Sequence, residues 1–157
     1  MKRLKKYART SSLMDVRIKY GSDVFKFNLF EELKILEVRV NDELLEQPQV
    51  YGFLSMLHKK LIKKYKDLLQ ETEKILAKKR VHFYTSKFTE YYKANHSRPS
   101  EKIATAMAEA SKEYQEALTN ANSSEHDMNI VGTCVKAFEQ RAFLIQTLSA
   151  NIRKHGS

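Results

Sequence analysis

The sequence predicts an all-α fold: an elongated helical hairpin or bundle with a long central helix, a short N-terminal β-hairpin and an oligomerising C-terminal helix. Four glycines and two prolines among 157 residues supply too few turns for a many-stranded sheet. Apolar residues recur at three- and four-residue spacing over long stretches, as on the buried face of a helix. The length is close to the commonest size of one domain, so we expect one folded unit.

The chain begins with a basic arm and a predicted hairpin. Residues 1–9 contain no acidic side chain and five cations: Lys2, Arg3, Lys5, Lys6 and Arg9. Self-repulsion keeps such a segment extended until it meets an anion, and a solvated tail is the equal alternative. Apolar and polar residues then alternate on both sides of Gly21-Ser22, which is typical of a two-stranded hairpin. The alternating apolar residues are Val16, Ile18, Tyr20, Phe25 and Phe27.

The first helix is expected from Leu29 to Glu46. Asn28, three residues before Glu31, fits a helix N-cap with its reciprocal partner. Apolar residues then recur at helical spacing: Leu29, Leu33, Leu36 and Val40.

A second, long helix is expected to begin at Pro48, because the missing N–H of proline has no intrahelical partner in a first turn. No strong helix breaker follows before Asn95. Its apolar stripe repeats every seven residues, at Leu54, Leu61, Leu68 and Ile75. A helix of about 45 residues is about 65 Å long, more than a compact monomer of this size can cover. An extended hairpin or an oligomer is therefore implied.

A loop at residues 95–99 and a capping Ser100 predict a third helix, and the polar run Asn122-Ser123-Ser124 separates it from a fourth. The fourth helix carries one apolar row of Met128, Val131, Val135, Phe138, Ala142, Ile145 and Ile152. A second row lies beside it: Ile130, Cys134, Ala137, Leu144 and Leu148. We expect the first row to mediate self-association; the alternative is that both rows are core.

The residues give no sign of an enzyme. The five histidines are scattered without an HExxH pair, and the four glycines form no phosphate-cradling loop. The single Cys134 excludes an intramolecular disulfide and is expected to be a small buried side chain. We therefore expect no catalytic residue, metal or cofactor.

The location is expected to be cytoplasmic, in the host cytoplasm if a phage encodes the chain. No apolar stretch approaches the roughly 20 residues that span a bilayer, and no apolar signal-peptide region follows the basic start. We expect no membrane partner.

A net charge of +9 favours a polyanionic partner, with nucleic acid first and an anionic membrane surface or acidic protein second. Cations three or four residues apart form ridges along the long helix, and aromatic rings follow them. Such rings stack on the unpaired bases of a single strand at about 1–3 kcal/mol each. The alternative is a solvated lysine face with the rings in the core. The candidate nucleic-acid-binding residues are Lys59, Lys63, Lys66, Lys74, Lys78, Lys79, Arg80, Phe83, Tyr84, Lys87, Tyr91 and Tyr92.

Two segments resemble the UvsY-like family of phage recombination mediators. Residues 135–146 (VKAFEQRAFLIQ) resemble the family's C-terminal signature, an apolar helix that leads into an Arg-small-Phe-x-Ile run. Residues 77–84 (AKKRVHFY) resemble a stretch in which a lysine and an arginine two residues apart precede paired aromatics. Tyr91-Tyr92 is a second candidate for that pair. The pattern and the order of parts agree over roughly residues 28 to 154.

The resemblance implies a homo-oligomeric ring or barrel that binds single-stranded DNA. It also implies that the protein helps a RecA-like recombinase to displace the single-strand-binding protein. The roles implied at matching positions are phosphate contact for Lys78 and Arg80, base stacking or strand support for Phe83 and Tyr84, and structural roles for Arg141 and Phe143.

Three regions are expected: a basic arm and small hairpin at 1–27, a helical basic-aromatic DNA-binding region at 28–98, and a helical oligomerisation region at 99–157. The expected function is that of a recombination mediator without chemistry of its own. The alternative is a non-enzymatic helical scaffold or adaptor protein without DNA binding, in which the lysines only confer solubility.

Overall fold

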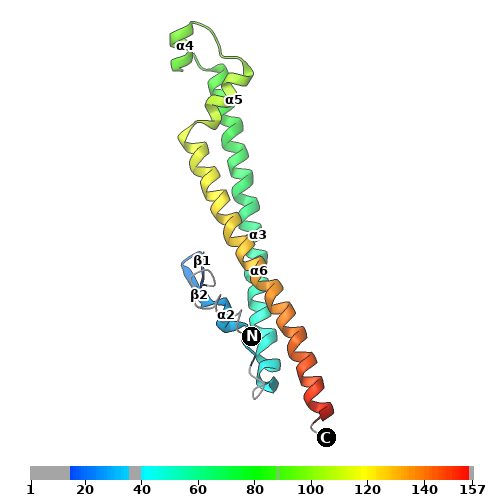
Figure 1. Ribbon diagram of the computed structural model, residues 1–157. Coiled ribbons are helices and arrows are strands. Elements are labelled where there is room, and N and C mark those ends of the chain that lie inside the picture. The colour runs from blue at the N-terminus through cyan, green and yellow to red at the C-terminus, as the bar shows by residue number, and fades with distance from the viewer. Residues whose placement is uncertain (1–14, 36–39, 88, 156–157) are drawn as a thin grey trace, which may run out of the picture. The chain divides into compact units, whose positions relative to one another are not determined.

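The computed structural model describes residues 15–35, 40–87 and 89–155 (Figure 1). Its elements are β1 (Asp15–Tyr20), β2 (Asp23–Asn28), α2 (Leu29–Glu32), α3 (Val40–Thr85), α4 (Glu90–Asn95), α5 (Glu101–Glu109) and α6 (Lys112–His155). The predicted helical fold with a long central helix and a short N-terminal hairpin is confirmed. The basic arm at residues 1–9, Leu36 and Phe88 lie outside the described residues.

The chain divides into two compact units. Unit 1 comprises Met1–Leu61 and Asp127–Ser157, and unit 2 comprises Ile62–His126. Unit 1 therefore contains the hairpin, α2, the first part of α3 and the last part of α6. Unit 2 contains α4, α5 and the other parts of the two long helices.

The hairpin forms where the alternation predicted it. β1 pairs with β2 in antiparallel register, with Val16 opposite Phe27 and Ile18 opposite Phe25. Gly21 lies at the first central position of the two-residue turn with a φ of +63°. Glycine favours this position because a positive φ there suits the twist of the paired strands.

The core of unit 1 holds the hairpin against α3 and α6. Ile18 is fully buried, and the cluster combines the hairpin's Val16 and Ile18 with Leu54, Leu57, Leu61, Val131, Cys134 and Phe138. Each fully buried side chain of this size contributes about 1.5–3 kcal/mol, which stabilises a hairpin that would be marginal alone. Burial raises the pKa of the Cys134 thiol, as expected for a small core side chain.

The predicted first helix from Leu29 to Glu46 is wrong. Asn28 caps α2 as expected, with its side chain accepting from the Glu31 N–H, but α2 ends at Glu32. The next helix begins only at Val40. The intervening sequence contains β-branched residues in alternation with others, which lowers helix propensity.

Pro48 does not begin a helix, as the sequence indicated, but lies inside α3. An internal proline removes one backbone hydrogen bond and costs roughly 3 kcal/mol. Burial on both sides of it offsets this cost, because Val40, Gln47 and Leu54 are all at least 95% buried. Packing therefore carries the helix through a residue that would end it locally.

The long helix also ends earlier than Asn95, at Thr85. A new helix, α4, follows after Thr89, whose buried side chain accepts from the Tyr92 N–H at 3.3 Å. His96 then closes α4 in the left-handed region with a φ of +51°. Ser100 caps α5 as predicted by accepting from the Ile103 N–H at 3.3 Å.

The expected break at residues 122–124 is wrong, because α6 runs through it from Lys112 to His155. The chain breaks instead around Ala110 and Ser111, between α5 and α6. Asparagine and serine cost only a few tenths of a kcal/mol each in a helix, and Ser124 is buried. Small side chains dominate the buried positions of unit 2, at Ala104, Ala108 and Ala121.

A buried polar network lies beside the apolar core of unit 1. Arg141 of α6 donates to the side chains of Glu43 and Gln47 on α3 and, at 3.0 Å, to the backbone oxygen of Lys34. Gln47 in turn donates from Nε2 to the backbone oxygen of Phe138 at 2.7 Å. The network joins α6 to α3 and to the segment after α2.

Gly52→Ala is expected to raise the free energy of unfolding by about 0.5–1 kcal/mol, because Gly52 lies within α3 and alanine is the better helix former. A Cβ at Gly52 would meet no atom within 4 Å. Gly132→Ala is the matched comparison, since a Cβ there would lie 2.9 Å from His58 Nε2. Thermal unfolding followed by circular dichroism measures both. A loss of stability in Gly52→Ala would contradict the open position.

Candidate nucleic-acid interface

The predicted lysines of α3 are solvent-facing. Lys59, Lys63, Lys66, Lys74 and Lys78 are all exposed, as is Lys87 just beyond the helix. Lysine side chains in such positions are free to reach an anion without unfolding the helix that carries them. Their exposure agrees equally with a solvated face.

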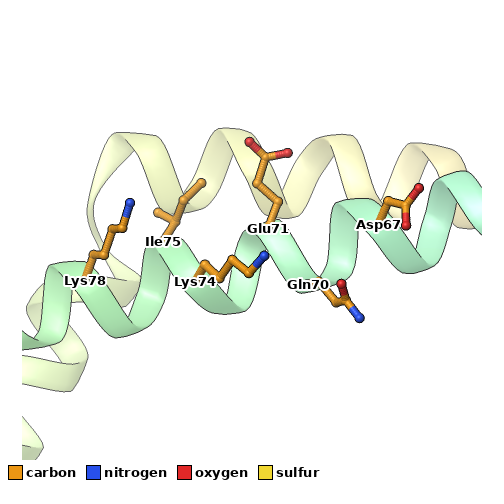
Figure 2. Close-up of a pocket in the computed structure, with 6 residues that line it drawn as sticks. All are labelled: Asp67, Gln70, Glu71, Lys74, Ile75 and Lys78. Carbon is orange, nitrogen blue, oxygen red and sulfur yellow. The ribbon is translucent and has the colours of Figure 1, made fainter.

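A shallow hollow along α3 in unit 2 mixes both charges. It has a volume of about 540 Å³ and is lined by Asp67, Gln70, Glu71, Lys74, Ile75 and Lys78. Figure 2 shows these side chains along a single helix, with the acids interspersed among the cations. Two carboxylates offset two ammonium groups, so this stretch is not uniformly positive.

A second hollow at the C-terminal end of α3 combines charge, ring and apolar surface. It has a volume of about 290 Å³ and is lined by Arg80, Val81, Tyr84, Thr85 and, from α5, Glu101. Tyr84 is 45% exposed and Val81 is 60% exposed. An Arg Nη2 atom lies 3.5 Å from Oε1 of the acid. We call this set the Arg80–Tyr84 hollow.

The chemistry of this hollow suits an unpaired nucleotide. A guanidinium can bind two oxygens of a phosphate, and an exposed ring offers a face for base stacking. The Arg80–Glu101 pair is about half exposed or more on both sides, and pairs of that kind contribute only about 0–1 kcal/mol. A phosphate can therefore replace the glutamate at little cost.

Two other residues of the same motif are engaged inside unit 2. Lys79 donates to Glu113 of α6, and this hydrogen bond lowers the pKa of Glu113. Phe83 is half-buried with its ring edge-on to His82 at a centroid distance of 5.5 Å. These positions place Lys79 and Phe83 closer to structural roles than Arg80 and Tyr84.

The tyrosine pair of the second alignment lies on a different helix. Tyr91 and Tyr92 are half-buried on α4, while the pair Phe83-Tyr84 belongs to α3. The Tyr92 backbone is used at both ends of α4, since its N–H donates to Thr89 and its oxygen accepts from His96.

The predicted oligomerisation row of α6 is divided. Val131, Phe138 and Ile145 are at least 98% buried within the chain, and Met128 and Val135 pack against the core cluster of unit 1. Ala142 is half-buried, and only Ile152 of the row is exposed, at 47%.

Sequence reasoning missed the most exposed apolar residues of α6. Phe143 is 69% exposed and Leu144 is 57% exposed. Leu144 had been placed in the second apolar row, and Phe143 had been given a structural role. The signal was the continuous run of apolar residues at 142–145, because a helix cannot direct four consecutive side chains to one core.

The described part of the chain shows no group of three or more His, Cys, Asp or Glu side chains placed to hold a metal ion. Within those same residues, no helix combines the length and apolar character that crossing a membrane requires. The interface described above therefore offers binding groups, namely cations, a phenol ring and apolar side chains.

Comparison with known proteins gives matches among solved structures. Neither a family model nor a curated protein matches the chain. Three crystal structures of the bacteriophage T4 recombination mediator protein UvsY are similar, with TM-scores of 0.66, 0.65 and 0.64 for lattice types I, II and IV. The identities are 15%, 14% and 15%, and each match covers 82% of this chain and 93–96% of the other. The fold implied by the sequence resemblance is confirmed.

Proposed function

We propose that this chain is a recombination mediator. It binds single-stranded DNA non-specifically as a homo-oligomeric ring or barrel, and it promotes loading of a RecA-like recombinase in place of single-strand-binding protein. Residues 28–98 contribute the DNA contacts, and residues 99–157 contribute to assembly. The protein performs these steps by binding alone.

The observation that carries the proposal is the Arg80–Tyr84 hollow on a chain with the UvsY fold. Lys78 and Arg80 occupy the positions where the family resemblance implies phosphate contact, and Tyr84 occupies one of the aromatic positions. Arg80 and Tyr84 share one hollow with an exposed ring and an exposed cation. A phosphate on the arginine and a base on the ring require only adjacent parts of one strand.

Exposed apolar side chains in unit 1 support assembly. Besides Phe143 and Leu144, the exposed set of unit 1 includes Ile152 and, on α3, Leu45, Phe53 and Met56. Isolated exposed apolar residues are normal, but several large ones within one unit are typical of an interaction surface. We therefore assign the contact between copies to Phe143, Leu144 and Ile152 rather than to the buried part of the predicted row.

Tyr84→Ala is expected to weaken binding of a fluorescent single-stranded oligonucleotide by roughly 5- to 150-fold, since one stacked base contributes about 1–3 kcal/mol. Tyr84→Phe is the matched control and is expected to bind like the wild type, because it keeps the ring. Arg80→Gln is expected to lower the slope of log affinity against log salt by about 0.7, which corresponds to one phosphate. Fluorescence anisotropy across a salt series measures all three variants.

Absence of oligonucleotide binding by the wild type at low salt, or binding indifferent to salt, would contradict the proposal. The second candidate is a helical scaffold or adaptor without DNA binding. It is favoured by the ion pairs of Lys79 with Glu113 and Arg80 with Glu101, which give two of the cations a partner within the chain. It expects Tyr84→Ala and Arg80→Gln to leave oligonucleotide binding unchanged.

A further inference from the structure

The β1–β2 hairpin has a cationic face that points away from the core of unit 1. Val16 and Ile18 are buried, so the alternate residues Arg17 and Lys19 lie on the opposite face of β1. The register places Lys26 directly opposite Arg17. All three cations are exposed. We call this set, Arg17, Lys19 and Lys26, the outer face.

The outer face does not serve the stability of the hairpin. Like charges directly opposite each other on paired strands are destabilising, and Arg17 faces Lys26 in this way. The one acid on the same face, Asp15, accepts a hydrogen bond from Asn28 Nδ2 at 2.7 Å at the end of the ladder. The other acid of the hairpin, Asp23, lies beside the turn near Ser22. A neutral polar pair would suit the fold better than two cations.

The aromatic residues of the hairpin occupy its other face. Phe27 and Phe25 are paired with the buried Val16 and Ile18, and both pack against the core cluster, as does Tyr20. Lys60 of α3 lies over the Tyr20 ring with its Nζ 5.5 Å from the centroid. This contact fixes the turn end of the hairpin against α3. The outer face consequently presents charge on a firmly attached ribbon and no ring for a base to stack on.

We propose that the outer face binds the phosphodiester backbone of single-stranded DNA, as a second contact in addition to the Arg80–Tyr84 hollow. The proposal rests on the proposed function and extends it to a part of the chain outside residues 28–98. Three cations on one face of a ribbon complement the repeating negative charge of a strand. Because no ring lies on that face, the contact depends on salt and not on base identity.

The test is the full-length triple variant Arg17→Gln, Lys19→Gln, Lys26→Gln. The slope of log affinity against log salt for a labelled single-stranded oligonucleotide is expected to fall by about 2, from about 0.7 per phosphate. The matched control replaces three exposed cations outside both proposed surfaces, Lys112, Lys136 and Lys154, by Gln. Both variants lose three charges, from +9 to +6, so the control isolates position from net charge. The control is expected to keep most of the slope.

Thermal unfolding of the hairpin variant is expected to equal or exceed that of the wild type, since the like-charge pair is gone. Equal loss of slope in both triple variants, or wild-type slope in the hairpin variant, would overturn the proposal while leaving the proposed function intact. Failure of the wild type itself to bind would contradict both. Unchanged oligonucleotide binding with lost co-sedimentation on phosphatidylserine vesicles would assign the outer face to a membrane surface and also overturn the proposal.

Discussion

Glu43→Gln is expected to lower the free energy of unfolding by about 3 kcal/mol, because it leaves the Arg141 guanidinium buried without its counter-ion. The Arg141 side chain is only 8% exposed and that of Glu43 only 14%. At such burial the positive charge recovers little hydration when the carboxylate is removed. Urea denaturation followed by circular dichroism measures the loss.

Two further variants separate charge from packing in this experiment. Glu32→Gln changes an exposed acid of α2 and is expected to alter stability by less than about 0.5 kcal/mol. The double variant Glu43→Leu, Arg141→Met removes both charges and is expected to recover most of the stability lost in Glu43→Gln. Equal stability of Glu43→Gln and Glu32→Gln would show that the ion pair does not hold α3 to α6.

The parts of the fold that were predictable depend on local chemistry. The hairpin follows from alternation around Gly21, and the starts of α2 and α5 follow from side-chain caps at Asn28 and Ser100. Each signal spans a few residues, and its hydrogen bonds form within the same segment. Local rules were wrong where packing decides, as at Pro48 and at residues 122–124. There the buried neighbours of the helix outweigh a modest or even large local penalty.

Long-range pairings could not be predicted from the same rules. Arg141 meets Glu43 across 98 positions, and Lys79 meets Glu113 across 34. The composition offers many cations and acids of equal chemistry, so only the packed helices decide which of them meet. The sequence could therefore indicate a basic-aromatic segment, but it could not separate Lys79, which is engaged, from Lys78 beside it, which is exposed.

The apolar rows of α6 illustrate the same ambiguity for assembly. A seven-residue repeat has the same appearance whether it packs against another helix of its own chain or against a second copy. Val131, Phe138 and Ile145 prove to be interior, whereas Phe143 and Leu144, adjacent to that row, are exposed. Burial thus reassigns the candidate contact by a rotation about the helix axis.

Phe138→Ala is expected to lower the free energy of unfolding by about 3–5 kcal/mol, because it opens a cavity in the core of unit 1 where the ring is 98% buried. Phe143→Ala removes an equally large ring from the same helix at 69% exposure. It is expected to change the stability of the monomer by less than about 0.5 kcal/mol. Chemical denaturation at low protein concentration measures both values.

The same two positions distinguish folding from assembly. If Phe143 contacts a second copy, Phe143→Asp lowers the mass measured by light scattering while the circular dichroism spectrum stays helical, because a buried charge disfavours association. Association also makes the wild-type melting temperature depend on protein concentration, and that dependence is expected to weaken in Phe143→Asp. A wild type that is monomeric at every concentration would remove the assembly role of Phe143. The expected loss of stability in Phe138→Ala would still stand, since its contacts lie within one chain.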